Sequence, residues 1–330
     1  MLRKKIAFLC TTVLVACVLA STAMGATTLR LSTNHTEDFV TSQAIRFFAD
    51  RVKERTNGEL VVECYYNAVL GEEKAAAEQT QFGAIDFLRI SISPMSEFVP
   101  ELNAIQLPFI YADAAHYWKA LDDPEIGLKL LKSQKSKDAG FYGLAYYDGG
   151  ARSFFFRNKT VRSPADMANL TIRVQESALM VGLIRILGAN PTAMPSSDVY
   201  GALQTGVIDG AENNIPFYLS QSYNEVSPFI TLNEHTRVPD SLFMSTMTAN
   251  KLTAEQLKII EECAMESSHF QRKAWAESEI SGEKKAIELG CTITKLTPAE
   301  KQKFMDMVKP LNAKEGAAYT DLLAAIAKLQ

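Results

Sequence analysis

The chain has 330 residues, of which 47% are hydrophobic and 22% charged, and its formal net charge is −4. This length suffices for two domains of ordinary size, and the apolar fraction supports packed cores. A mildly acidic chain lacks the positive surface with which proteins bind nucleic acids, so the composition excludes that class of partner.

The first 25 residues have the pattern of a secretory signal peptide. Arg3, Lys4 and Lys5 precede an uncharged apolar run from Ile6 to Ala20, and small residues follow. The run is shorter than the roughly 20 residues that span a membrane. We therefore predict export to the periplasm with cleavage near Gly25–Ala26, which leaves a mature chain of net charge −7.

Two other interpretations of this segment stay open. One is an uncleaved signal anchor, which the short run and the small residues after it disfavour. The other rests on Leu14-Val15-Ala16-Cys17, which resembles a lipoprotein cleavage box and would tether the protein through lipid on Cys17. No later stretch is apolar and uncharged for the 18 residues that a membrane span needs.

Three cysteines remain after the predicted cleavage: Cys64, Cys263 and Cys291. They are odd in number and far apart, so they do not form a disulfide framework, and none has zinc-ligand spacing. We predict three buried thiols, with one bridge among them as the alternative. The sequence predicts no metal and no cofactor.

The mature chain begins with an alternation of strands and helices. Strands are predicted over 28–33, 60–66 and 85–92, and helices over 40–55 and 72–82. The first helix is amphipathic, because Ala44, Phe47, Phe48 and Val52 share one face, and Asn57-Gly58 ends it. This βαβαβ order predicts a parallel sheet with helices on its faces.

Further elements follow along the chain. Helices are predicted over 112–137, from Ser163-Pro164, over 177–187, 196–204 and 252–289, from Thr297, and over 315–328. Strands are predicted over 141–147, 153–157, 170–174, 207–211 and 242–248. The segment 252–289 is periodic and charged with few breakers, which indicates one long helix or two in tandem.

The fold class that these elements predict is α/β with two lobes, a hinge and a central cleft, as in periplasmic binding proteins. No Pro/Gly/Ser-rich linker divides the chain, so strands that cross between the lobes would hide the boundary. We assign 1–25 to the signal peptide, 26–150 mainly to the first lobe and 151–240 mainly to the second. Residues 241–330 would supply a crossover strand, the long helix and C-terminal helices that pack on both lobes.

Known enzyme motifs are absent from the sequence. It contains no GxSxG, P-loop, HExxH or GxGxxG, and its four histidines share no local spacing. Asp148-Gly149-Gly150 lacks the Lys and Ser/Thr of a phosphate loop, so it predicts a tight turn between two strands. We therefore predict a protein that is not an enzyme.

Long motifs between Gly149 and Tyr218 carry a family resemblance. They are GARSFFFRNKTVRSPADMANLTIRV and, further on, LGANPTAMPSSDVYGALQTGVIDGAENN. Together with the opening TNH and the LGEEKAAAEQTQFGAIDF segment, they make the mature chain similar to the substrate-binding components of TRAP (tripartite ATP-independent periplasmic) transporters. The resemblance implies a small carboxylate ligand in a cleft between two lobes and delivery to a two-part membrane permease.

The resemblance assigns ligand-binding roles to residues that match the family's motifs. Arg173, before Val174, matches the arginine that clamps the ligand carboxylate with two parallel N–H donors. Asn213 in AENN matches an asparagine that hydrogen-bonds the ligand. Asn214 is a weaker candidate, and one of the two asparagines would cap the helix that follows. Arg152 in GGARS matches a second arginine that faces the ligand and would help to offset the cost of burying an anion.

Further candidates lie mostly in the first half of the chain. Glu73 in LGEEK matches an acidic contact, which must serve hydroxyl groups or a cationic centre because a carboxylate repels an anion. Asn34 and His35 follow the first strand, and Arg89 lies near the end of the third, where such clefts gather ligands. Each has a structural role as its alternative. Tyr218 is a candidate for stacking on a sugar ring, with a core aromatic as the alternative.

Five features of the sequence resemble the family's uronate-binding branch, whose ligands are hexuronates such as glucuronate and galacturonate. They are Asn34-His35, Arg89, GGARS, AENN and NEHTRVPD. Two departures from the pattern of that branch weaken the assignment of its ligands to this chain. Ile215 follows AENN where that branch has tryptophan, and Ser196 and Ser197 stand where a bulkier residue is common. Another sugar acid, a C4-dicarboxylate or a small hydroxy acid stays open as the ligand. An extracytoplasmic sensor and a sugar-acid enzyme stay open as other functions.

Overall fold

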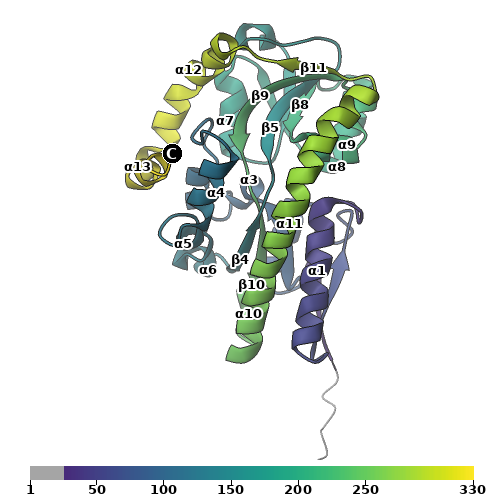
Figure 1. Ribbon diagram of the computed structural model, residues 1–330, viewed down its shortest axis with the longest axis vertical. Coiled ribbons are helices and arrows are strands. Elements are labelled where there is room, and N and C mark those ends of the chain that lie inside the picture. Colours follow the sequence, from purple (N-terminus) through teal and green to yellow (C-terminus); the bar gives the residue numbers. More distant parts are fainter. Residues whose placement is uncertain (1–25) are drawn as a thin grey trace, which may run out of the picture.

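The computed structural model describes residues 26–330, so the predicted signal peptide and Cys17 lie outside the described residues. Two sheets, each covered by helices, lie one above the other along the long axis of the molecule (Figure 1). We call the part around the first sheet the first lobe and the part around the second sheet the second lobe. This arrangement confirms the predicted two-lobed α/β fold.

The first sheet has the strand order β2-β1-β3-β10-β4. Its strands are β1 (Thr27–Ser32), β2 (Leu60–Tyr65), β3 (Phe87–Ser91), β4 (Phe141–Tyr147) and β10 (Asp240–Ser245). β1, β2 and β3 are parallel, as the βαβαβ pattern predicts, whereas β10 runs antiparallel between β3 and β4. Helices α1 (Val40–Arg55) and α2 (Glu73–Gln81) connect the parallel strands, and α1 buries Ala44, Ile45, Phe48 and Val52.

The second sheet has the order β11-β9-β5-β8-β6-β7. Its strands are β5 (Ala151–Phe156), β6 (Thr171–Val174), β7 (Asn190–Ala193), β8 (Gly210–Asn213), β9 (Phe229–Arg237) and β11 (Thr292–Lys295). The sequence did not predict β7, β9 or β11. The strand predicted over 207–211 lies later, at β8, because Val207 is an exposed residue before the strand rather than part of its apolar face.

The region predicted as helical over 112–137 contains three short helices: α4 (Ala114–Asp122), α5 (Gly127–Leu131) and α6 (Gln134–Asp138). Ser163 does form a capping box, but it begins only the 3-10 helix η2 (Pro164–Met167). The predicted helices 177–187 and 196–204 are α7 (Ala178–Ile186) and α8 (Ser196–Thr205). Short helices that the sequence did not predict are α3 (Ile92–Met95), η1 (Pro100–Ile105), η3 (Tyr223–Glu225) and α10 (Thr246–Ala249). The helix expected after the two asparagines is α9 (Ile215–Ser220).

The chain crosses between the lobes at 148–150, between β4 and β5, and again at 238–239, between β9 and β10. The first crossing lies where the sequence predicted a tight turn, and that prediction was wrong, because 148–150 carries the chain from one sheet to the other without a turn. A Cβ at Gly149 would collide with the carbonyl oxygen of Val238, and Gly150 has φ +64° beside Trp275. The two strand crossings therefore approach each other more closely than a residue with a side chain would allow.

Helix α11 (Ala254–Glu288) is one continuous helix of 35 residues. A capping box of Thr253 and Gln256 begins it. It packs against α1 and β4 of the first lobe and α9 of the second, and in Figure 1 it runs along both lobes. It is the third connection between the lobes.

The chain ends with α12 (Pro298–Glu315), the 3-10 helix η4 (Ala317–Tyr319) and α13 (Thr320–Ala327). α12 packs against α7 of the second lobe. Near the end of the chain, the carbonyl of Ile326 in α13 lies 2.7 Å from the ring Nε2 of His116 in α4 of the first lobe. The C-terminal helices therefore contact both lobes.

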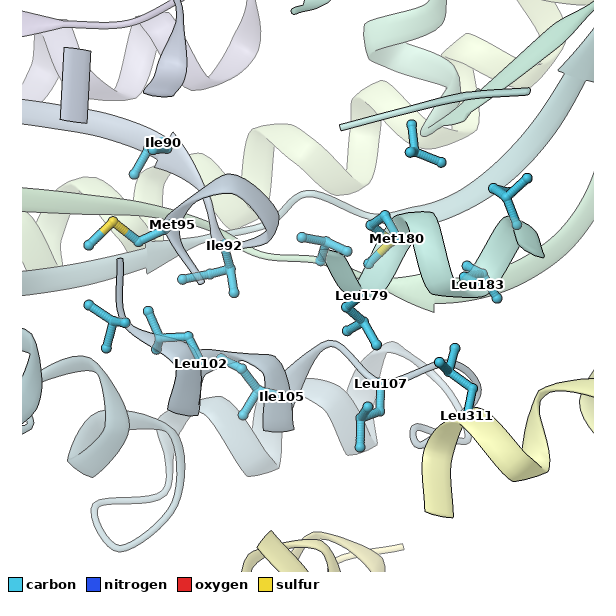
Figure 2. Packing of buried hydrophobic residues seen from close by; sticks show 14 of the residues in the cluster. Ile90, Ile92, Met95, Leu102, Ile105, Leu107, Leu179, Met180, Leu183 and Leu311 are labelled. Atoms are coloured by element: carbon cyan, nitrogen blue, oxygen red, sulfur yellow. The ribbon is translucent and has the colours of Figure 1, made fainter. Parts of the chain in front are cut away.

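The largest hydrophobic cluster joins the two lobes beside the cleft. Figure 2 shows residues of β3, α3 and η1 on one side and of α7 on the other: Ile90, Ile92, Met95, Leu102, Ile105, Leu179, Met180 and Leu183. All three cysteines of the described residues are free thiols. Across residues 26–330, no helix combines the length and the hydrophobicity that a membrane crossing requires.

Candidate ligand-binding site

A narrow cleft with about 30 Å³ of space lies between the two lobes. Eight of the nine residues that the sequence predicts for the site line this cleft: Asn34, His35, Glu73, Arg89, Arg152, Arg173, Asn213 and Asn214. They come from both sheets and from segments far apart in the chain. The fold therefore brings these predicted residues together in one cleft.

Arg173, on β6, is a buried cation without a carboxylate partner. Its Nε and Nη2 donate to the carbonyl of Met194 at 3.0 and 2.6 Å. No carboxylate among residues 26–330 forms an ion pair with it, although the residue is only 4% exposed. Burial lowers the pKa of Arg173, yet an arginine keeps its charge in proteins. Its remaining N–H groups can bind an anion in the cleft.

Arg152, on β5, is held by a buried carboxylate. Its Nε and Nη2 donate to the two carboxylate oxygens of Glu212 at 2.5 and 2.8 Å, and Nη2 also donates to the Glu212 carbonyl. Burial alone would raise the pKa of Glu212, but Arg152 and His235 outweigh it and lower that pKa to about 2. Glu212 therefore already neutralises the charge of Arg152, and the contribution of Arg152 to binding the ligand anion stays a prediction.

The two asparagines at the end of β8 have different roles. Asn214 is the N-cap of α9, and its side-chain oxygen accepts from the amide of Phe217 at 2.7 Å. Asn213 accepts from Nη1 of Arg152 at 2.9 Å, so it links that arginine to the cleft. The N-cap role that the sequence left open between them belongs to Asn214.

The first-lobe end of the cleft is built around Arg89. This buried guanidinium donates to Glu73 Oε1 at 3.0 Å and forms an ion pair with Asp240. Glu73 Oε1 also accepts from the amide of Ser91 at 2.9 Å. Burial raises the pKa of Glu73, and Arg89 and the Ser91 amide oppose that rise. With two carboxylates around one arginine, this end of the cleft carries no spare positive charge.

Asn34 and His35 lie directly after β1. Asn34 accepts from Arg89 at 2.8 Å and donates to the hydroxyl of Ser196 at 3.0 Å, so it connects the two lobes. His35 is buried and packs edge to face against Phe39. Burial and the charge of Arg89 hold the pKa of His35 well below its usual value, so its ring is neutral.

Tyr218 is the exception among the predicted site residues. Its side chain is buried in a cluster with Phe155 and Tyr223, and its hydroxyl donates to the carbonyl of Ser227 at 2.9 Å. It does not line the cleft. The core alternative is therefore the correct one, because α9 turns this residue toward the second sheet.

The sequence analysis did not assign several lining residues: Phe39, Ser91, Gly149, Gln175, Phe217, Val238 and Asp240. Asp240 ends the NEHTRVPD segment, and Gln175 follows Arg173 by two residues. The position of Asp240 and Gln175 near predicted residues and motifs was the signal that could have identified them. Glu212 also went unassigned, although it stands between Ala211 and Asn213 in the AENN motif.

The two departures from the uronate-binding pattern differ in their relation to the cleft. Ile215 does not line it. A Cβ placed on Gly282 of α11 would lie 3.3 Å from Ile215, which puts this side chain against α11. Ser196 does line the cleft, and Ser197 donates its amide to Glu72 at 3.2 Å. Only the serine departure changes the wall of the cleft.

The cleft has two chemically different ends. The second-lobe end offers the unpaired Arg173, whereas the first-lobe end offers carboxylate oxygens of Glu73 and Asp240 beside Arg89. Within the part of the chain that the structure describes, no group of three potential ligand side chains could hold a metal ion. The geometry suits an anion that carries hydrogen-bond donors at its other end.

This cleft between two lobes joined by a hinge defines a solute-binding protein. Comparison with known families agrees with that class: residues 31–317 match the family described as bacterial extracellular solute-binding protein, family 7 (DctP). The chain belongs to this family, which supplies solute-binding components of TRAP transporters.

Solved structures and curated relatives of the chain come from several bacteria. A TRAP periplasmic solute-binding protein from Bradyrhizobium, in complex with α/β-D-galacturonate, is 38% identical with a TM-score of 0.88 and covers 92% of this chain and 100% of its own. One from Pseudomonas putida, with bound D-glucuronate, is 32% identical with a TM-score of 0.88, covering 91% and 96%. The 2,3-diketo-L-gulonate-binding periplasmic protein YiaO of Escherichia coli is 28% identical over 94% of both chains.

Proposed function

We propose that this protein captures a hexuronate, glucuronate or galacturonate, in the periplasm and delivers it to the membrane permease of a TRAP transporter. The observation that carries the proposal is Arg173, a buried guanidinium that faces the cleft and has no carboxylate partner among residues 26–330. A ligand carboxylate would form an ion pair with Arg173 through two parallel hydrogen bonds, in a site that excludes water.

The opposite end of the cleft supports a ligand with hydroxyl groups. Glu73 and Asp240 each engage Arg89 through one oxygen, and both residues line the cleft. Their other oxygens are acceptors, and they require donors from the ligand. A sugar acid provides hydroxyl donors there, whereas the second carboxylate of a C4-dicarboxylate would be repelled. Similarity to uronate-bound proteins supports the same ligand class.

Capture would use closure of the lobes about the hinge. The ligand contacts Arg173 and Asn213 from the second lobe and Glu73 from the first, so the full set of contacts exists only in the closed state. The differential binding energy then favours closure, and the closed form is the form that a permease would recognise. The family membership supports a permease as the partner.

Isothermal titration of the purified chain against matched acids tests this proposal. We expect glucuronate or galacturonate to bind, and we expect succinate and galactarate, the dicarboxylate counterpart of galacturonate, to bind at least about tenfold more weakly because of repulsion from Glu73 and Asp240. Glucose, which lacks the carboxylate, controls for the role of Arg173 and should not bind measurably.

Bound ligand must be removed by unfolding and refolding before the titration. Tight binding of succinate would redirect the proposal to dicarboxylates, and binding of glucose equal to that of glucuronate would remove the role of Arg173. No binding of either uronate by refolded protein would overturn the proposed ligand.

A further inference from the structure

Two carboxylates of the first lobe lie on the N-termini of two second-lobe helices. Glu97, between α3 and η1, accepts the amide of Ala178 at 2.7 Å, and Ala178 is the first residue of α7. Glu72, just before α2, accepts the amide of Ser197 at 3.2 Å, in the first turn of α8. Both contacts join the two lobes, and neither involves Arg173.

The two helices have no side-chain cap of their own. The N-cap residue of α7 is Ser177, whose buried hydroxyl has no hydrogen-bond partner among the described residues. The N-cap residue of α8 is Pro195, which has no side chain that can accept a hydrogen bond. The first amides of a helix need acceptors, and a negative charge at this end is favoured by the helix dipole. In both helices the carboxylate comes from the opposite lobe.

Each contact is joined to another interlobe contact. At α8, Ser196 donates to Glu72 at 3.4 Å and accepts from Asn34 at 3.0 Å, and both Ser196 and Asn34 line the cleft. At α7, the capped turn leads into the apolar contact of Leu179 and Met180 with residues of the first lobe (Figure 2). Glu72 and Glu97 are thus placed at two separate points of the interlobe boundary.

We propose that Glu72 and Glu97 are positioning residues that raise ligand affinity by holding the lobes closed, without touching the ligand. The inference concerns closure and does not depend on which acid binds. In an open state the first amides of α7 and α8 would lose these acceptors. The two contacts therefore stabilise only the closed state, and apparent affinity rises with the population of that state.

The test compares Glu72→Gln, Glu97→Gln and the double variant with the intact chain. Each single change should raise Kd about three- to tenfold, as expected for loss of a charge-assisted contact at a helix end. The double variant should show about the product of the two factors, since the carboxylates share no partner. Ligand dissociation should be faster, and melting of the ligand-free chain should change little.

Glu78→Gln is the matched control, because Glu78 is an exposed residue of α2 and its substitution removes the same charge. It should leave Kd unchanged. Titration of the intact chain with the uronates tests the proposed function by itself. The variants are then titrated with the acid that binds the intact chain most tightly. A double variant with the Kd of the intact chain would overturn the proposal. The proposal would also be overturned if the ligand-free variant lost as much free energy of unfolding, measured by melting, as it lost free energy of binding, since this would indicate a structural role only.

Discussion

Arg152 and Arg173 line the same cleft, carry the same charge and are almost equally buried, yet their surroundings differ. Arg152 is bound through both carboxylate oxygens of Glu212, whereas the hydrogen bonds of the Arg173 side chain within residues 26–330 go to the backbone carbonyl of Met194. The first is an internal ion pair that shapes the wall of the cleft. The second has no direct carboxylate partner among residues 26–330, so a ligand carboxylate can pair with it. A position in the cleft is therefore not sufficient evidence for a carboxylate clamp, and the ion-pair partners must be known as well.

The largest expected effect concerns the paired arginine. Glu212→Gln leaves the buried charge of Arg152 without its partner and should lower the free energy of unfolding by about 3 kcal/mol or more. Urea denaturation measures this. Adding Arg152→Met to the same chain should restore part of the loss, because it removes the stranded charge. A Glu212→Gln protein as stable as the parent would show that the two arginines do not differ as described.

The unpaired arginine should show the opposite behaviour. Arg173→Ala should raise the Kd for the bound acid by about a hundredfold or more, as expected for loss of a desolvated charge pair, and should leave the fold intact. Arg173→Lys keeps the charge but loses the fork, so it should also weaken binding. Titration together with circular dichroism checks both, with the exposed Arg185→Ala on α7 as control. Unchanged affinity in Arg173→Ala would remove the clamp.

Neutral His35 makes the first-lobe end of the cleft sensitive to acid. Its pKa in the folded chain is well below the unfolded value of about 6.5, so below that pH the unfolded chain binds a proton that the folded chain does not. Stability is complete above pH 6.5 and falls by roughly 1 kcal/mol per pH unit below it, from this residue alone. His35→Gln should have a flatter profile in thermal melts between pH 7.5 and 5.5. Parallel profiles would contradict the assignment.

The smallest effect separates the two adjacent asparagines. Asn214→Ala should lower the free energy of unfolding by about 1 kcal/mol through loss of the α9 cap, and Asn214→Ser should recover most of it. Thermal denaturation measures the difference. If Asn214→Ser is as unstable as Asn214→Ala, the bond from Asn214 to the Gly149 carbonyl at the hinge matters more than the cap.

Local patterns were sufficient to predict much of the first lobe. The bounds of α1 and β4 coincide with the prediction, since an amphipathic period and an apolar run both have clear ends there. The second lobe was harder to predict. β9 carries Glu234 and His235 in its interior, and β7 contains Pro191, so neither has the alternation of an ordinary strand. Their places are set by tertiary pairing.

The site residues were predicted from family motifs, whereas their charges could not be assigned to partners. Nothing in the sequence indicates that Arg152 pairs with Glu212, or that Arg89 is shared by Glu73 and Asp240, which lie 167 positions apart in the chain. Such pairs form only when distant segments meet. For the same reason Tyr218 was ambiguous, because a buried tyrosine and a ligand-stacking tyrosine have the same local sequence.

The place of β10 in the first sheet has a consequence for how the chain reaches its fold. This strand enters the sheet between β3 and β4, although almost the whole second lobe separates it from them in sequence. Residues 26–150 alone would leave β3 and β4 without the strand that joins them. The first sheet therefore cannot be completed until residue 245 has been synthesised, after almost all of the second sheet.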